Sequence, residues 1–154
     1  RNRSARGGFK QFMIKDVIIE IKTEQTVDDS TDKIEFTTDA RFGFRDGSYF
    51  ISYDESKLME VEGEIKTTLY VKPNASVDLQ RKGAYNSRMV IEKGVRNNCL
   101  YATPNGEFSL GIFGEKVFAD LGDDGGNITM NYTIDSGLQL LSRNKVNISI
   151  REVN

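Results

Sequence analysis

Apolar and polar residues alternate between residues 60 and 72, and this alternation constrains the fold more than any other feature of the chain. Ile65 and Leu69 fall at odd positions of the segment, whereas Glu64 and Lys66 fall at even positions. Because a β-strand points successive side chains to opposite faces, one face of this segment is expected to be buried and the other to meet solvent.

Similar alternating segments recur along the chain and are separated by turn signals such as Asp46-Gly47 and Asn105-Gly106. We predict strands at residues 15–23, 33–38, 49–53, 60–72, 76–82, 88–93, 99–103, 107–113 with a continuation at 116–121, 127–134 and 138–153. No segment has the pattern of an amphipathic helix. The sequence therefore predicts an all-β protein, a single antiparallel up-and-down closed β-barrel of about 8–10 strands.

Length and charge indicate one domain with a distinct N-terminal segment. The chain has 154 residues and a net charge of −2. Four of its 21 basic residues lie in residues 1–12, which contain no acid, so residues 13–154 carry 17 basic and 23 acidic residues and a net charge of −6. We interpret residues 1–12 as a cloning remnant or a disordered basic tail, with an RNA-binding arm as the alternative, and residues 13–154 as the barrel domain. A body of this charge argues against nucleic-acid binding.

Cysteine and histidine usage excludes several kinds of site. The chain has one cysteine, Cys99, and no histidine. An internal disulfide, the usual histidine-dependent triads and the common zinc sites are therefore excluded. We find neither an export signal nor an apolar run of about 18 residues, so we expect no membrane span. With a single cysteine, these features favour a cytoplasmic protein.

The chain also resembles a known family. The resemblance rests on the order and spacing of residues 49–53, 63–69, 79–83, 103–106 and 126–134, and it covers roughly residues 15–153. In these stretches the sequence resembles the YwiB-like family of small bacterial proteins of unknown function. That resemblance implies a calycin (lipocalin)-like barrel and a bacterial source. It implies no substrate and no catalytic residues.

Arg81 is the first candidate for a functional residue. It shares the parity of Val77 and Leu79, so its side chain is expected to point into the barrel. A buried guanidinium is costly unless it is paired. One interpretation is an anchor for a ligand carboxylate or phosphate. The alternative is an internal salt bridge with a glutamate, or a cap at one end of the barrel.

Four further polar side chains share parity with apolar neighbours and are expected to line the same interior: Tyr53, Thr67, Tyr101 and Tyr132. Their polar tips could orient a ligand. Alternatively, each hydroxyl bonds a neighbour inside a filled core.

These observations favour a non-enzymatic barrel that binds a small apolar or anionic molecule in an internal pocket. The alternative is a barrel with a filled core that acts in protein–protein interaction or homodimerisation. A carboxylate- or tyrosine-dependent enzyme is the third hypothesis, and no catalytic residue is assigned. We expect no cofactor and no metal, because the acidic residues near Gly125 lack the spacing of a helix-loop-helix calcium site.

Overall fold

The computed structural model describes residues 12–56, 63–84, 86–103 and 105–153. These residues form ten strands. The strands are β1 (Phe12–Val27), β2 (Ser30–Arg45), β3 (Ser48–Asp54), β4 (Ile65–Val71), β5 (Val77–Gly83), β6 (Ser87–Ile91), β7 (Arg96–Thr103), β8 (Gly106–Gly122), β9 (Gly125–Asp135) and β10 (Leu140–Glu152).

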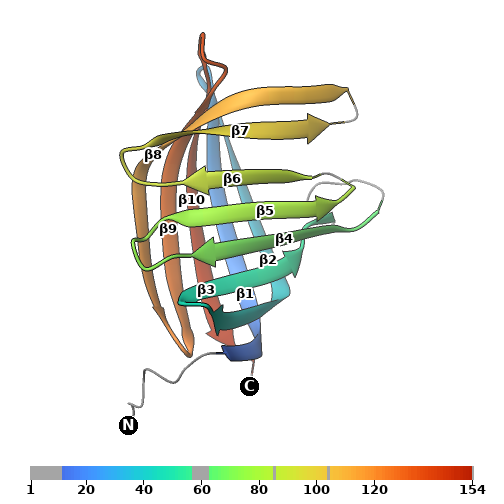
Figure 1. The fold of residues 1–154 in the computed structure, drawn as a ribbon, viewed down its shortest axis with the longest axis vertical. Coiled ribbons are helices and arrows are strands. Elements are labelled where there is room, and N and C mark those ends of the chain that lie inside the picture. Colours follow the sequence, from blue (N-terminus) through green and yellow to red (C-terminus); the bar gives the residue numbers. More distant parts are fainter. Residues whose placement is uncertain (1–11, 57–62, 85, 104, 154) are drawn as a thin grey trace.

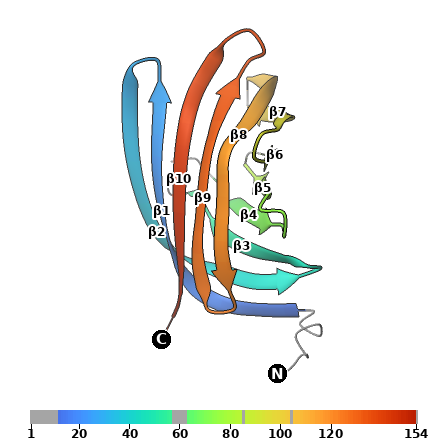
Figure 2. The ribbon, with the colours of Figure 1, turned by 90° about the vertical axis from the view of Figure 1, so that its left-hand side faces the viewer.

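The ten strands form one closed antiparallel barrel, as the alternation predicted. Each strand pairs with its neighbours in sequence, and β1 pairs with β10 to close the sheet. The short strands β3–β7 cross the long strands β1, β2 and β8–β10 (Figures 1 and 2). The closure is weakest between β6 and β7, which share one residue pair, Ser87–Tyr101, among the described residues.

Every second residue of a strand faces the interior, as expected for a barrel. In β4, Ile65, Thr67 and Leu69 are almost completely buried. In β10, buried Val146 and Ile148 alternate with exposed residues in the same way. The predicted inner face of residues 65–71 is therefore confirmed.

Some strand boundaries differ from the prediction. The polar stretch at residues 26–32, which separates the predicted strands 15–23 and 33–38, is the tip of a β1–β2 hairpin in which Val27 pairs with Ser30. Asp28 adopts a φ of 54° in that turn. A hairpin tip that extends beyond the core has no buried face, so its strands lack the alternating pattern. The strand predicted from residue 60 begins at Ile65, and residues 57–62 lie outside the described part.

Apolar side chains fill the middle of the barrel. Phe42, Ile51 and Met130 are among the largest fully buried residues, and they belong to one continuous hydrophobic cluster. Because consecutive strands run in opposite directions, the connections alternate between the two ends. We call the end with the β3–β4, β5–β6 and β7–β8 connections the Glu55 end, and the end with the β2–β3, β4–β5 and β8–β9 turns the Tyr49 end.

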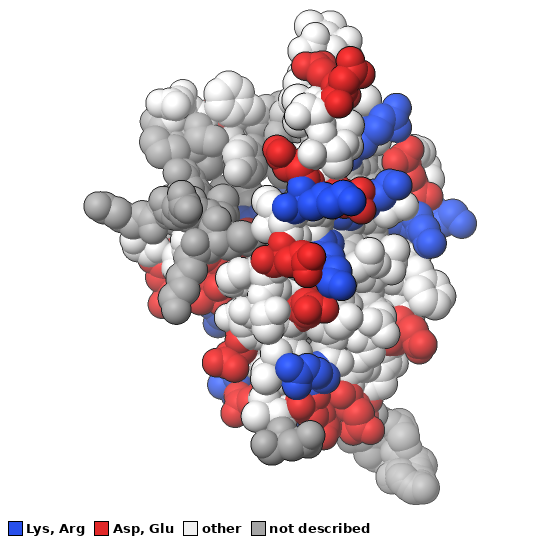
Figure 3. Space-filling model, turned by 180° about the vertical axis from the view of Figure 1, so that it is seen from behind, with Lys and Arg blue, Asp and Glu red and all other residues white. Residues whose placement is uncertain are grey.

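The outer surface carries both signs of charge. On the face opposite to that in Figure 1, basic and acidic side chains are interspersed (Figure 3). Exposed ion pairs on the outer face include Lys22–Glu20 at 3.8 Å and Arg143–Glu115 at 3.7 Å. Such exposed pairs contribute little to stability, and their mixture creates no single-sign patch on the visible face.

Candidate functional site

Strand register brings four of the predicted site residues into one row on the inner face. Tyr53 pairs with Thr67, Thr67 with Arg81, Arg81 with Ser87, and Ser87 with Tyr101, across the adjacent strands β3 to β7. Paired residues in antiparallel strands project to the same face. The row lies toward the Glu55 end, and Ser87 is a member that the sequence analysis did not select.

Glu55 is not part of this row but is hydrogen-bonded to three of its members, and sequence reasoning missed it. Only 5% of it is exposed. Its Oε1 accepts hydrogen bonds from the Thr67 hydroxyl at 2.7 Å and from the Tyr53 hydroxyl at 3.2 Å. Its backbone amide donates to the carbonyl of Ile65 at 2.8 Å, which holds the residue over the end of the barrel. Glu55 continues the odd parity of Tyr53, but the charged residues around it suggested a solvated loop.

Arg81 pairs with this buried carboxylate. Its Nε lies 3.4 Å from each of the two Glu55 carboxylate oxygens. The internal salt bridge with a glutamate, one of the two interpretations of Arg81, is therefore present. Burial alone would lower the pKa of the guanidinium, but the Glu55 carboxylate together with Tyr53 and Tyr132 outweighs this effect, and the pKa is raised. Arg81 thus keeps its positive charge inside the barrel.

Tyr132, from β9, completes the cluster. It is 9% exposed, and burial raises the pKa of its hydroxyl, while the charges of Arg81 and Glu55 act on it in opposite directions. All five predicted residues therefore face the interior, with Tyr101 only partly buried. We call Tyr53, Glu55, Thr67, Arg81, Ser87, Tyr101 and Tyr132 the polar cluster.

One donor of the polar cluster has no acceptor among the described residues. The hydroxyl of Ser87 is buried without a hydrogen-bond partner there. Buried polar groups are normally hydrogen-bonded, so this hydroxyl needs an explanation.

The polar cluster consists of hydrogen-bonding side chains around one ion pair, Arg81–Glu55. Burial raises the pKa of the Tyr53 hydroxyl, and the Glu55 carboxylate raises it further, so this phenol keeps its proton at neutral pH. The Cys99 thiol donates to the carbonyl of Arg88 at 2.8 Å, and burial raises its pKa as well. Among the described residues, no group of three or more metal-binding side chains is present.

The partly buried Tyr49 leads to a prediction about stability at alkaline pH. Burial, followed by the hydrogen bond to Asp123, raises the pKa of Tyr49 to about 12. An unfolded tyrosine loses its proton near pH 10, so the folded state holds protons that the unfolded state has released. The contribution of Tyr49 to the free energy of unfolding should be constant below about pH 10. It should fall as the pH rises from about 10 toward 12.

Urea denaturation across this pH range would measure the effect. The Tyr49→Phe variant should lose less stability than the wild type over the same interval. Equal losses in the two proteins would contradict the assignment to Tyr49.

A closed up-and-down barrel of ten strands with a mostly filled interior belongs to the calycin-like class of folds. Residues 19–148 match the sequence profile of a domain of unknown function, DUF1934, and the chain belongs to this family. The resemblance to YwiB-like proteins is thereby confirmed. The crystal structure of the ywiB protein from Bacillus subtilis is similar with a TM-score of 0.80 and 21% sequence identity, covering 92% of this chain and 94% of that chain.

At this identity the structural similarity shows the fold alone. No protein with curated annotation matches the chain. Within its described residues, the chain has no helix of the length and hydropathy needed to cross a bilayer.

Proposed function

We propose that the protein is a non-enzymatic barrel that binds a small molecule, and that the polar cluster at the Glu55 end holds an anionic group of this ligand. The observation that carries the proposal is the buried Ser87 hydroxyl, which has no hydrogen-bond partner among the described residues and pairs across the sheet with Arg81. A carboxylate or phosphate group would supply the acceptor that this hydroxyl needs, next to the Arg81 charge.

The geometry of the Arg81–Glu55 pair supports this role. In the described part of the chain, the hydrogen bonds between Arg81 and Glu55 use the Nε of the guanidinium. Two parallel N–H groups match the two oxygens of a carboxylate or phosphate. The salt bridge also fixes the Arg81 side chain before a ligand arrives, and a preorganised site loses less conformational entropy on binding.

The buried thiol of Cys99 supports a reducing environment. Cys99 is a free, buried cysteine on β7, and its thiol is hydrogen-bonded to the carbonyl of Arg88 on the neighbouring strand β6. We therefore place the protein in a compartment such as the cytoplasm, where free thiols persist.

The proposal is tested by calorimetric titration with two probes, sodium octanoate and inorganic phosphate. At least one probe should bind the wild type, and Arg81→Gln should weaken that binding by about tenfold or more. Ser87→Ala removes a hydroxyl without a protein partner among the described residues, so it should weaken binding while leaving the free energy of unfolding almost unchanged.

Arg88→Gln is the matched control, because Arg88 pairs with Asp78 on the outer face and is 62% exposed. Its affinity should equal that of the wild type. Equal affinity in the Arg81 and Arg88 variants, or no binding of either probe to the wild type, would refute the proposed anion site. Native mass spectrometry of protein purified from its own host would then identify the natural ligand.

The filled middle of the barrel favours a second candidate, an interaction or homodimerising domain. Leu138 is 97% exposed and Leu100 is 63% exposed, so apolar side chains are available on the surface. Light scattering would distinguish the 17.4 kDa monomer from a dimer.

A further inference from the structure

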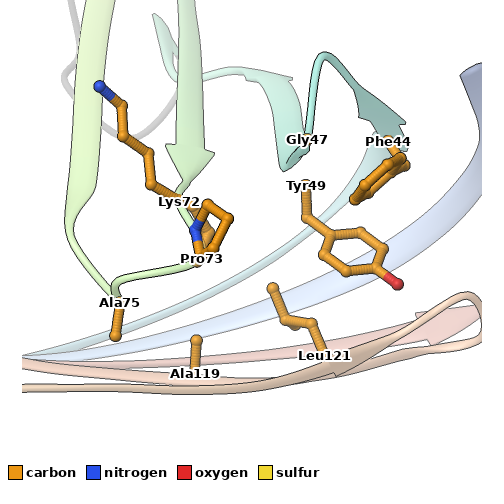
Figure 4. Close-up of a pocket in the computed structure, with 9 residues that line it drawn as sticks. Phe44, Gly47, Tyr49, Lys72, Pro73, Ala75, Ala119 and Leu121 are labelled. Carbon is orange, nitrogen blue, oxygen red and sulfur yellow. The ribbon is translucent and has the colours of Figure 1, made fainter. Parts of the chain in front are cut away.

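A separate pocket opens at the Tyr49 end of the barrel, at the opposite end from the polar cluster. Its volume is about 360 Å³. It is formed by the β2–β3 turn, the β4–β5 turn and the last part of β8. The side chains of Tyr49, Pro73 and Leu121 converge on it, with the methyl groups of Ala75 and Ala119 forming its floor (Figure 4).

The wall of this pocket is apolar and uncharged. The amine of Lys72 points away from the space between the other side chains (Figure 4). The Tyr49 hydroxyl donates to Asp123 Oδ1 at 3.1 Å, so the ring and not the hydroxyl faces the pocket. A ligand at this position would gain its binding energy from burial of apolar surface and from contact with an aromatic ring.

Two sets of contacts hold the wall in place. The ring of Tyr49 stacks on buried Phe42 at a centroid distance of 5.3 Å and meets the edge of Phe44 at 4.9 Å. In the β4–β5 turn, the Ala75 amide donates to the Lys72 carbonyl at 2.8 Å. The pocket is therefore formed before any ligand binds.

Ala75 adds an independent observation. Its φ is +61°, in the left-handed region that glycine adopts readily and alanine does not. A glycine would fit this turn with less strain, but it would lack the methyl group that forms part of the floor. Strained backbone that is retained in a structure is often found at ligand sites.

From these observations we propose that the pocket at the Tyr49 end binds a small uncharged aromatic molecule of one or two fused rings. The volume suits such a molecule and is too small for a helix or strand of a partner protein. The site goes beyond the anion site proposed above, because it lies at the other end of the barrel and presents different chemistry.

The test is a titration of the full-length protein with indole, followed by two-dimensional NMR of the backbone amides. Saturable shifts are expected at Gly47, Ala75 and Ala119, and not at Arg81 or Ser87. Ala119→Leu places a larger side chain in the floor and should weaken indole binding by about tenfold or more.

A control variant outside the pocket separates the two sites. Arg81→Gln should bind indole as well as the wild type does, so loss of the anion site and loss of this pocket are distinguishable. The inference is overturned if indole gives no saturable shifts, if the shifts cluster at the Glu55 end, or if Ala119→Leu binds indole normally.

Discussion

Replacement of Glu55 with alanine is expected to lower the free energy of unfolding by about 3–5 kcal/mol. Glu55 is buried, and it accepts hydrogen bonds from Tyr53, Thr67 and Arg81. Its removal leaves the Arg81 charge inside the barrel without a partner among the described residues and leaves two hydroxyls without their acceptor. Urea denaturation would measure the loss.

Glu107→Ala is the appropriate control, because Glu107 is an exposed glutamate at the same end of the barrel, on β8. That change should alter stability by no more than about 0.5 kcal/mol. A loss below about 1 kcal/mol for Glu55→Ala would show that the Arg81 charge is solvated and would contradict the buried pair.

The Glu55→Ala, Arg81→Met double variant tests the pairing itself. It should be more stable than Glu55→Ala alone, because an apolar side chain replaces the unpaired guanidinium. The double-mutant cycle should therefore give a clear coupling energy between positions 55 and 81. The proposed anion site would be lost in the double variant although the barrel is retained.

The second large effect is expected at Gly126, the second residue of β9, just after the tight turn that joins β8 and β9. Gly126→Ala should lower the free energy of unfolding by about 3 kcal/mol or more. Gly126 has a φ of 142°, and a Cβ atom there would overlap the carbonyl oxygen of Asp120. Since that oxygen belongs to the β8 backbone, relief of the overlap would require movement of a strand.

Gly47→Ala provides the comparison that separates strain from overlap. Gly47 also has a positive φ, of 82°, but a Cβ atom there would meet nothing within 4 Å. We therefore expect a cost of only about 1 kcal/mol, from the backbone conformation alone. Thermal unfolding of the two variants would measure the difference, and similar losses would contradict a steric cause at Gly126.

The inner face of the barrel could be predicted from the chain, since alternation is a local property that each strand carries in its own sequence. That is why Arg81, Tyr53, Thr67, Tyr101 and Tyr132 were all expected to point inward, and they do. The closed up-and-down barrel followed from the number of such strands and the turns between them, whereas the calycin-like class was implied by the resemblance to the YwiB-like family.

Glu55 could not be predicted in the same way. It lies just beyond the last residue of β3, where a run of charged residues gives no pattern. Its position depends on the hydrogen bond from its backbone amide to the carbonyl of Ile65 in the next strand. The pocket at the Tyr49 end was missed for a related reason. Its wall combines residues from two turns and from β8, which are far apart in sequence.

The sequence by itself therefore determined which side chains face the axis of the barrel, because strand periodicity is set by neighbouring residues. Only the tertiary structure decided which of them meet, because register and closure set the distances between strands. Register aligned Thr67, Arg81 and Ser87 in one row. The long-range packing of the β2–β3 and β4–β5 turns against β8 made the second pocket.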